Sequence, residues 1–129
     1  RLAKRYLRKL RSLRLVKLPV AAPESALHLF PLRIDFKTLG KTREHLFAFM
    51  ANQGVNLQVH YIPVHLHPYY RNRFGYKLGD FPVAEKVYDE EVSLPLYPTL
   101  TIKQQDKVIG LIKGFLKVTG HLRQSGKVF

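Results

Sequence analysis

The sequence predicts an α/β domain of the α+β-like kind, in which a short sheet is covered by helices and a basic amphipathic helix stands at the N-terminus. Four segments place apolar residues at helical spacing, and short strand-like runs lie between them. Prolines and glycines mark most of the boundaries. The chain has 129 residues, 46% hydrophobic and 24% charged, so it can bury one core without disulfides or metals.

The first predicted element is a basic amphipathic helix over residues 2–13. Its apolar positions are Leu2, Tyr6, Leu10 and Leu13, and Arg and Lys fill most other positions. Eight of the 22 basic residues fall within the first 17 residues, which contain no acid, so the net charge of +13 is concentrated here. We expect the apolar stripe to pack on this domain or on a neighbouring chain.

The cationic face of this helix allows two interpretations. It can be the solvated back of a packed helix, or it can be a patch for nucleic acid or another anionic ligand. One tyrosine supplies little base stacking, which favours the first interpretation. The alternative, a small basic nucleic-acid-binding module with a function of a different class, stays open.

After Pro19 ends the first helix, residues 26–36 form the first predicted strand. Pro31 within it suggests an edge position or a bulge. A second helix is predicted over residues 42–53, with Gly54 as its stop. Its buried residues should be Leu46, Phe49 and Met50.

Residues 57–62 alternate as a short strand that Pro63 ends. Residues 64–80 are predicted as an irregular loop with one helical turn. A third helix begins at Pro82. It should bury Ala84, Val87 and Tyr88 and leave the acidic run 89–91 as an exposed helix end.

A brief strand over residues 93–97 is closed by prolines, and Thr101 with Gln104 forms a capping box for the last helix. The residues from 119 onward are predicted to be a polar, frayed tail. The core face of the last helix should consist of Ile102, Val108, Ile109, Ile112, Phe115 and Leu116.

Several functional classes lack their signatures. The absence of cysteine excludes a disulfide scaffold and thiolate zinc sites. No apolar run reaches the length of a membrane span, and no phosphate-cradling glycine loop or nucleophile motif occurs. These features suit a cytoplasmic protein without membrane contact. The chain begins at Arg1 rather than methionine, which is consistent with a missing upstream part and equally with tag removal or N-terminal processing.

The densest group of functional side chains lies in residues 60–71, which contain three histidines and three tyrosines. Three interpretations remain open: a metal site, whose nearest acid in sequence is Asp80; structural histidines with half-buried tyrosines; and a polar cradle for hydroxyls or phosphate. Alternation along the preceding strand means that His60 and Tyr61 cannot both point into the core, so one must face outward.

Three motifs occur in a specific order along the chain. They are His60-Tyr61-x-Pro63-x-His65-x-His67-Pro68-x-Tyr70, then Gly75-Tyr76-x-x-Gly79-Asp80-Phe81-Pro82-x-Ala84-Glu85, then Ser93-Leu94-Pro95-Leu96-Tyr97-Pro98. In this order and spacing they resemble the DegT/StrS-type sugar-nucleotide aminotransferases, over about residues 1–116. The amino-acid sequence of the first two motifs looks most like that of enzymes that aminate 4-keto-6-deoxy nucleotide sugars, including the flagellin-sugar and spore-coat polysaccharide branches.

The resemblance implies a domain organisation. Residues 1–18 would be the end of an interdomain linker helix, residues 19–118 the small C-terminal domain of a fold-type-I enzyme, and residues 119–129 a tail. The full-length protein would be a homodimer that uses pyridoxal phosphate to transfer an amino group, from glutamate, to a keto-sugar nucleotide.

The resemblance also implies what this chain lacks and what it supplies. The Schiff-base lysine, the acid that pairs with the pyridine nitrogen and the phosphate-binding residues belong to the large domain. We therefore expect no bound pyridoxal phosphate and no activity in this chain alone. We expect His60, Tyr61, His65 and Tyr69 to face the nucleotide-sugar substrate in the complete enzyme, and no catalytic or metal-binding residue to lie here.

Overall fold

The computed structural model describes residues 1–20, 25 and 27–117 of the chain. The predicted tail over residues 119–129 lies outside the described residues. The elements in chain order are α1 (Leu2–Leu10), β1 (Val16–Lys17), β2 (Phe30–Ile34), α2 (Phe36–Leu39), α3 (Arg43–Asn52), the 3-10 helix η1 (Val64–Leu66), α4 (Pro68–Phe74), α5 (Pro82–Glu90), β3 (Glu91–Leu94) and α6 (Ile102–Lys117).

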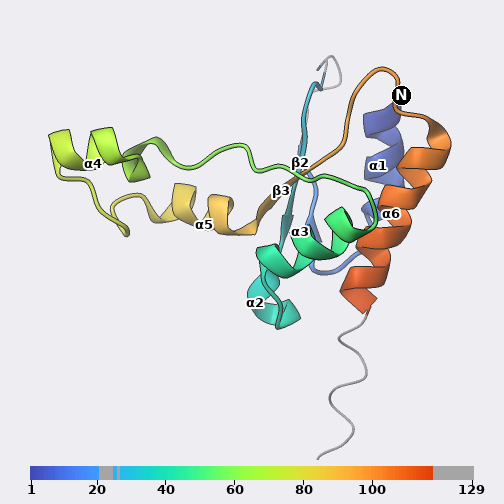
Figure 1. The fold of residues 1–129 in the computed structure, drawn as a ribbon, viewed down its shortest axis with the longest axis horizontal. Helices are drawn as coiled ribbons and strands as arrows, with labels where there is room; N and C mark the ends of the chain where they lie inside the picture. Colours follow the sequence, from blue (N-terminus) through green and yellow to red (C-terminus); the bar gives the residue numbers. More distant parts are fainter. Residues whose placement is uncertain (21–24, 26, 118–129) are drawn as a thin grey trace, which may run out of the picture.

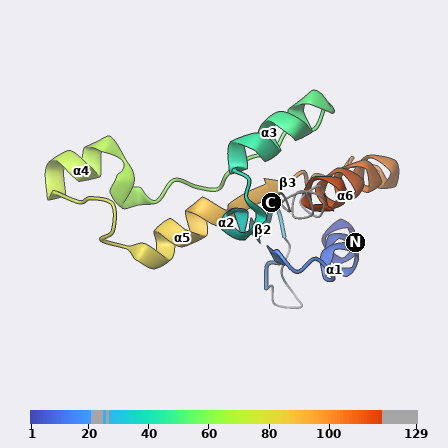
Figure 2. The same cartoon turned by 90° about the horizontal axis from the view of Figure 1, so that it is seen from below.

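The described residues form a compact body and a long arm (Figure 1). The body holds the sheet together with α1, α2, α3 and α6. The arm, residues 61–90, contains η1, α4 and α5 and leaves the body on the side away from α1 and α6 (Figure 2). This mixture of helices with a short sheet confirms the predicted fold class.

The sheet has the order β1-β2-β3, and both pairs are antiparallel. Along β2 the side chains alternate, so Phe30, Leu32 and Ile34 are buried on the core face. Pro31 was predicted to mark an edge position or a bulge. β2 is the central strand of the sheet, but Pro31 lies beyond the part of β2 that pairs with β1. It is tolerated because β1 pairs only with Arg33 and Ile34, so at Pro31 β2 has β3 alone as its neighbour.

The strand predicted over residues 57–62 is wrong. Gln58 alone pairs with Ser93, as an isolated bridge. Two residues later the His60 N–H donates to the Glu91 carboxylate at 2.9 Å instead of to a neighbouring strand. β3 spans Glu91–Leu94 instead of the predicted 93–97. It ends before Pro95 because proline has no N–H to donate to a neighbouring strand.

The prediction that the apolar stripe of α1 packs on this domain is confirmed for Tyr6, Leu10 and Leu13, whereas Leu2 is only half-buried and does not belong to the core cluster. The side chains of Tyr6 and Leu10 are fully buried, and Leu13, just past the end of the helix, packs against the same core. The Tyr6 hydroxyl donates to the Pro95 carbonyl at 3.0 Å, and burial raises the pKa of this phenol well above its usual range.

α1 lies beside α6 and is tied to it by polar contacts. Arg5 donates to the side chains of Gln105 and Asp106, and Gln105 donates to the Leu2 carbonyl at 2.9 Å. Gln105 is completely buried, and no pattern in the sequence predicts a polar side chain in the core at this position. Its partners are on a helix about 100 residues away in sequence, where no local pattern shows them.

Two predicted helices have close to their expected bounds. α3 begins after Thr42, whose side chain accepts from the His45 N–H, and the chain leaves it through Gly54 at φ +70°. The Thr101–Gln104 capping box of α6 is confirmed in both directions. Ile102 is 38% exposed, so its assignment to the core face of α6 is wrong; it is the first residue of the helix and lies outside the packed turns.

The arm differs most from prediction. Residues 64–80 were predicted as an irregular loop with one helical turn, and they contain more helix than that: η1 and then α4, which begins at Pro68 and is followed by Gly75 in the left-handed conformation. α5 was predicted to bury Ala84, Val87 and Tyr88, but the first two are exposed and Tyr88 is half-buried. The buried side chain of α5 is Glu85. Apolar spacing on α5 did not predict burial because α5 lies in the arm, beside little of the core.

Candidate functional site

The predicted functional cluster lies at the foot of the arm and along it. His60 is half-buried at the foot, and the peptide bond that joins it to Tyr61 is cis. The two rings meet edge to face with centroids 4.7 Å apart, and Tyr61 is 73% exposed. Tyr61 faces outward, but not through the strand alternation from which this was predicted, because residues 57–62 do not form the predicted strand.

A buried carboxylate and hydroxyl hold His60 in place. Val92 and Leu94 face the core from β3, so alternation places Glu91 and Ser93 on the opposite face. Ser93 Oγ donates to Glu91 Oε1 at 2.6 Å and lies 2.8 Å from His60 Nδ1. Glu91 Oε2 accepts the backbone N–H of His60. Glu91 and Ser93 are only 3% and 4% exposed.

The acidic run that contains Glu91 was predicted to be an exposed helix end, and this is wrong for two of its residues. Glu91 belongs to β3 and is buried. Glu90 accepts hydrogen bonds from Nε and Nη2 of Arg33 at 2.9 and 2.6 Å. Asp89 remains exposed.

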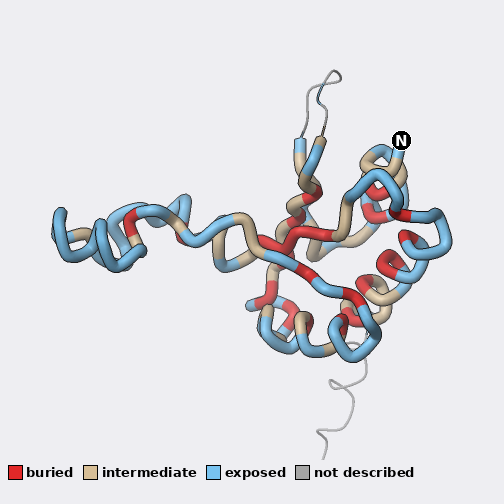
Figure 3. Tube along the Cα trace, turned by 45° about the horizontal axis from the view of Figure 1, so that its top comes forward, coloured by how far each residue is buried: buried red, intermediate tan, exposed pale blue. Residues whose placement is uncertain are grey.

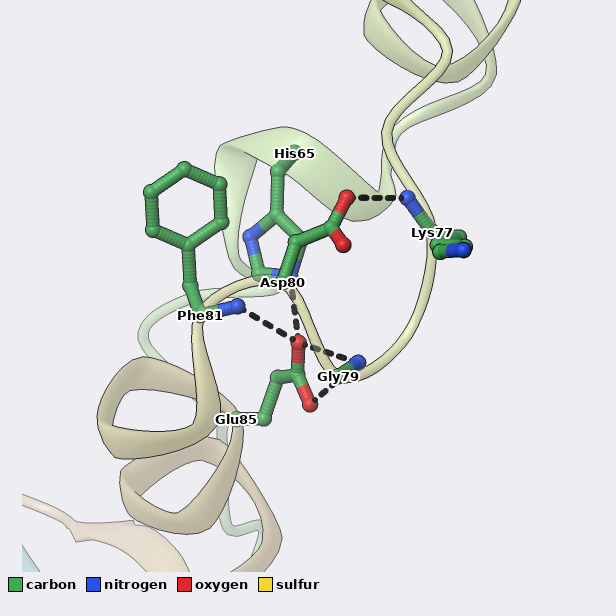
Figure 4. A network of polar contacts seen from close by, with 6 residues as sticks. All are labelled: His65, Lys77, Gly79, Asp80, Phe81 and Glu85. Atoms are coloured by element: carbon green, nitrogen blue, oxygen red, sulfur yellow. Dashed lines mark hydrogen bonds and ion pairs between the residues drawn. The ribbon is translucent and has the colours of Figure 1, made fainter.

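His65 is buried within the arm, where it pairs with Glu85 (Figure 4). Its Nε2 lies 2.8 Å from Glu85 Oε1, and its ring contacts that of Phe81 at 4.7 Å. Glu85 also accepts from the Gly79 N–H with both oxygens, at 2.9 Å each, and from the Phe81 N–H at 3.2 Å. His65 and Glu85 therefore join η1, the loop before α5 and α5 itself.

These contacts make the arm sensitive to acid. Burial raises the pKa of the Glu85 carboxyl, but the hydrogen bonds from His65, Gly79 and Phe81 outweigh burial and hold the pKa below its ordinary value of 4.5. A carboxyl whose pKa is lower in the folded state stabilises the fold above its unfolded pKa, and this stabilisation is lost as the pH falls through the folded pKa. The arm should therefore loosen below about pH 4.5.

Amide hydrogen exchange at Gly79 and Phe81 measures this effect. Protection should fall on acidification in the wild-type chain, before protection in α6 changes. In Glu85→Gln the protection of these two amides should be lower already at neutral pH and should no longer fall with acid. An unchanged pH dependence in Glu85→Gln would show that another group controls the arm.

Tyr69 lies on α4 and is 64% exposed. Its ring begins a series of aromatic contacts along the arm, with centroid separations between 5.3 and 6.1 Å. The series runs through Tyr69, Tyr70, Phe74, Tyr76 and Phe81. Figure 3 shows that most of the arm is exposed. The arm thus exposes several aromatic side chains that the described body does not cover.

The described residues of the body form a smaller and a larger hollow. The smaller, about 280 Å³, is at the foot of the arm, and its polar lining includes His28, Asn56, Gln58, His60, Ser93 and Tyr97. The larger, about 960 Å³, is a mainly apolar groove between the first turns of α1 and residues 96–102. The smaller hollow contains His60, so it is the stronger candidate for a polar ligand.

The structure brings together some of the predicted site residues but not all. His60 and Tyr61 are in contact, whereas His65 is inside the arm and Tyr69 is on its surface. The three histidines of the cluster have different partners, since His67 Nε2 bonds to the Ile62 carbonyl. Among the described residues, no three His, Asp or Glu side chains gather as a metal site would need.

Sequence reasoning missed Glu85, Glu91 and Ser93 as parts of this region. One signal was available: residues 91–94 read Glu-Val-Ser-Leu, in which polar and apolar residues alternate. In a strand that pattern places both polar side chains on one face, next to whatever lies outside the core. No helix in the described part of the chain is long and apolar enough to cross a bilayer.

Comparison with known proteins identifies relatives along most of the chain. It is 44% identical over 98 residues to the uncharacterized protein MJ1066 of Methanocaldococcus jannaschii. The aligned region covers 76% of this chain and 25% of MJ1066. It is 41% identical over 93 residues to the spore coat polysaccharide biosynthesis protein SpsC of Bacillus subtilis, covering 71% of this chain and 24% of SpsC.

Solved structures share the fold. One is DesV of S. venezuelae, crystallised in complex with a ketimine intermediate. It matches with a TM-score of 0.78 and 32% identity, over 90% of this chain and 30% of DesV. The PLP-form of the putative sugar aminotransferase Spr1654 of Streptococcus pneumoniae matches with a TM-score of 0.79 and 23% identity, over 92% of this chain and 30% of Spr1654. At that identity the second match concerns the fold alone.

The chain thus spans about a quarter to a third of the length of the proteins it matches. The family model of the DegT/DnrJ/EryC1/StrS aminotransferases matches residues 1–113, which include α1, the sheet, the arm and most of α6. The chain therefore belongs to the DegT/DnrJ/EryC1/StrS aminotransferase family.

Proposed function

We propose that this chain is the small C-terminal domain of a pyridoxal-phosphate-dependent aminotransferase that moves an amino group from glutamate to a keto-sugar nucleotide, in polysaccharide or surface-sugar biosynthesis. The match of the family model over residues 1–113 is the observation that carries the proposal. The name of SpsC, a spore coat polysaccharide protein, supports the sugar product. The ketimine intermediate in the DesV structure supports the cofactor.

The domain boundaries keep their predicted positions in this proposal. Residues 1–18 contain the end of the interdomain linker, whose helical part is α1 (Leu2–Leu10), residues 19–118 are assigned to the small domain, and residues 119–129 to a tail. The burial of Tyr6 and Leu10 against α6 supports a linker helix that ends on this domain rather than one that reads nucleic acid. We expect no sequence-specific nucleic-acid target and a cytoplasmic location.

Pyridoxal phosphate does not fit the residues that this chain supplies. The cofactor needs a lysine for its aldehyde, in a site that excludes water, and no lysine among the described residues is buried. The cofactor, which supplies the electron sink for amino transfer when bound, would be held by the large domain. This chain's own groups can bind, orient and enclose the sugar nucleotide.

His60, Tyr61 and Tyr69 offer imidazole and phenol groups that hydrogen-bond hydroxyls or phosphate oxygens. Tyr61 and Tyr69 are exposed, and His60 lines the hollow of about 280 Å³. His65 pairs with Glu85, so we assign it the role of shaping the arm that presents Tyr61 and Tyr69.

The arm exposes apolar side chains to solvent, which indicates that another part of the protein packs on it. Its exposed apolar residues include Ile62, Val64, Phe74, Leu78 and Val83, which are between 48% and 79% exposed. We propose that the protein's own large domain, or the second subunit of a homodimer, covers this surface and places the substrate cluster at the active site.

A substrate panel tests the proposed function. The full-length protein that carries this chain, incubated with pyridoxal phosphate and glutamate, should aminate a keto-sugar nucleotide and release 2-oxoglutarate. The matching sugar nucleotide with a hydroxyl in place of the ketone should give no product. Mass spectrometry of the nucleotide sugar follows the reaction. If 2-oxoglutarate is released when 2-keto acids are the amino-group acceptors, but not with any keto-sugar nucleotide tested, the assigned substrate class is contradicted.

A further inference from the structure

The buried chain of Glu91, Ser93 and His60 at the foot of the arm determines where a proton lies. Both oxygens of Glu91 accept hydrogen bonds, one from the His60 backbone N–H and one from Ser93 Oγ. Ser93 has a single hydroxyl hydrogen, and the 2.6 Å contact with the carboxylate uses it. Ser93 Oγ can therefore offer only a lone pair to His60.

His60 Nδ1 lies 2.8 Å from that lone pair, so Nδ1 must carry a hydrogen and donate it. In a neutral imidazole one nitrogen is a donor and the other an acceptor, and the bond made by one nitrogen sets the state of the other. Nε2 is then the acceptor. No group among the described residues hydrogen-bonds to Nε2, so it is available to a ligand.

We propose that Glu91 and Ser93 are positioning residues that hold His60 as its Nδ1–H tautomer, so that Nε2 accepts a hydrogen bond from a ligand O–H or N–H in the hollow of about 280 Å³. Asn56, Gln58 and Tyr97 line the same hollow with further neutral polar groups. Its volume is near the lower end of ligand pockets, which suits one polar portion of a larger ligand.

This assignment narrows the proposed substrate contact, and for the identity of the ligand it rests on the proposed function. A phosphate oxygen at neutral pH is mainly an acceptor, so it cannot pair with an acceptor Nε2. A sugar hydroxyl can donate to it. His60 should therefore bind a hydroxyl of the sugar and not the diphosphate of the nucleotide.

Nitrogen NMR tests the tautomer directly, without any need for activity. In the ¹⁵N-histidine-labelled chain at neutral pH, His60 should show a protonated Nδ1 and an unprotonated Nε2, with the signals assigned through His60→Gln. Ser93→Ala removes the acceptor and Glu91→Gln removes the charge that fixes the hydroxyl. Both should shift the proton towards Nε2. If the 129-residue chain does not fold alone, the same labels and variants are used in the full-length protein.

Val92→Ala is the matched control, because Val92 is equally buried on β3 but faces the core. It should lower stability and leave the tautomer of His60 unchanged. A wild-type His60 that is protonated on Nε2, whether neutral or as imidazolium, would overturn the proposal. A tautomer that Ser93→Ala does not change would also overturn it.

Kinetics in the full-length protein supply the second measurement. Ser93→Ala should raise KM for the keto-sugar nucleotide by about two- to tenfold, as the loss of one neutral hydrogen bond does, and leave the reaction with glutamate unchanged. Equal losses in both reactions would overturn the positioning role. If the full-length protein has no sugar aminotransferase activity, the proposed function fails, while the tautomer result still decides whether Glu91 and Ser93 control His60.

Discussion

Mixed with pyridoxal phosphate, the 129-residue chain alone is expected to form no internal aldimine at a defined lysine and to transfer no amino group. The reason is the environment of its lysines, of which none among the described residues is buried. A lysine that forms a stable Schiff base needs a site that excludes water. Lys41 and Lys113 are the two half-buried lysines of the described residues, and the Lys41 ammonium group already donates to the Phe115 carbonyl at 2.8 Å. The resemblance to the family implies that the Schiff-base lysine belongs to the large domain of the full-length protein.

Visible spectra before and after borohydride reduction, followed by peptide mapping, measure this. The full-length protein is the control and should yield one reduced adduct at one lysine. For the chain alone, reduction should label several lysines weakly and without saturation. A stoichiometric adduct at a single lysine of this chain would contradict the assignment of cofactor binding to the large domain.

Replacing Tyr6 with alanine should destabilise the chain by about 3–5 kcal/mol, the range for removing a buried aromatic side chain. Tyr6 is fully buried, and its ring lies against that of Phe30 with centroids 4.8 Å apart. Tyr6→Phe keeps the ring and loses only the bond to the Pro95 carbonyl, so it should cost about 0.5–1.5 kcal/mol.

Guanidinium unfolding gives both values, and Tyr69→Ala is the matched control because Tyr69 is 64% exposed. That variant should leave the free energy of unfolding almost unchanged. Equal stability of the Tyr6→Ala and Tyr69→Ala variants would mean that α1 is not an integral part of this fold.

In the body of the domain, the sequence predicted those helices whose apolar face packs on the core and whose ends are set by nearby capping residues. For α1, α3 and α6, apolar spacing identified the buried faces because each helix does meet the core. Thr42, Gly54 and the Thr101–Gln104 box determine helix ends through contacts a few residues long, which a sequence shows directly. The short elements β1 and α2 carry no pattern long enough to detect.

The arm could not be predicted in the same way. Apolar spacing on α5 indicates burial only if a core lies beside the helix, and here Val87 is exposed and Glu85 is buried. The candidate site depends on contacts across 20 to 33 residues, from His65 to Glu85 and from His60 to Ser93. The sequence thus located the histidines and tyrosines, whereas their partners became evident only in the structure.

The most direct test of the central claim, that this domain binds the sugar nucleotide, is to measure the two half-reactions separately in the full-length protein. His60→Ala, Tyr61→Phe and Tyr69→Phe each remove a proposed substrate contact, and Tyr88→Phe is a control elsewhere on the arm. Each contact should be worth about 0.5–1.5 kcal/mol, so kcat/KM for the keto-sugar nucleotide should fall by up to about tenfold, while the half-reaction with glutamate stays nearly unchanged. If both half-reactions fall equally in variants that remain folded, the cluster serves the cofactor or domain closure, and the claim is contradicted.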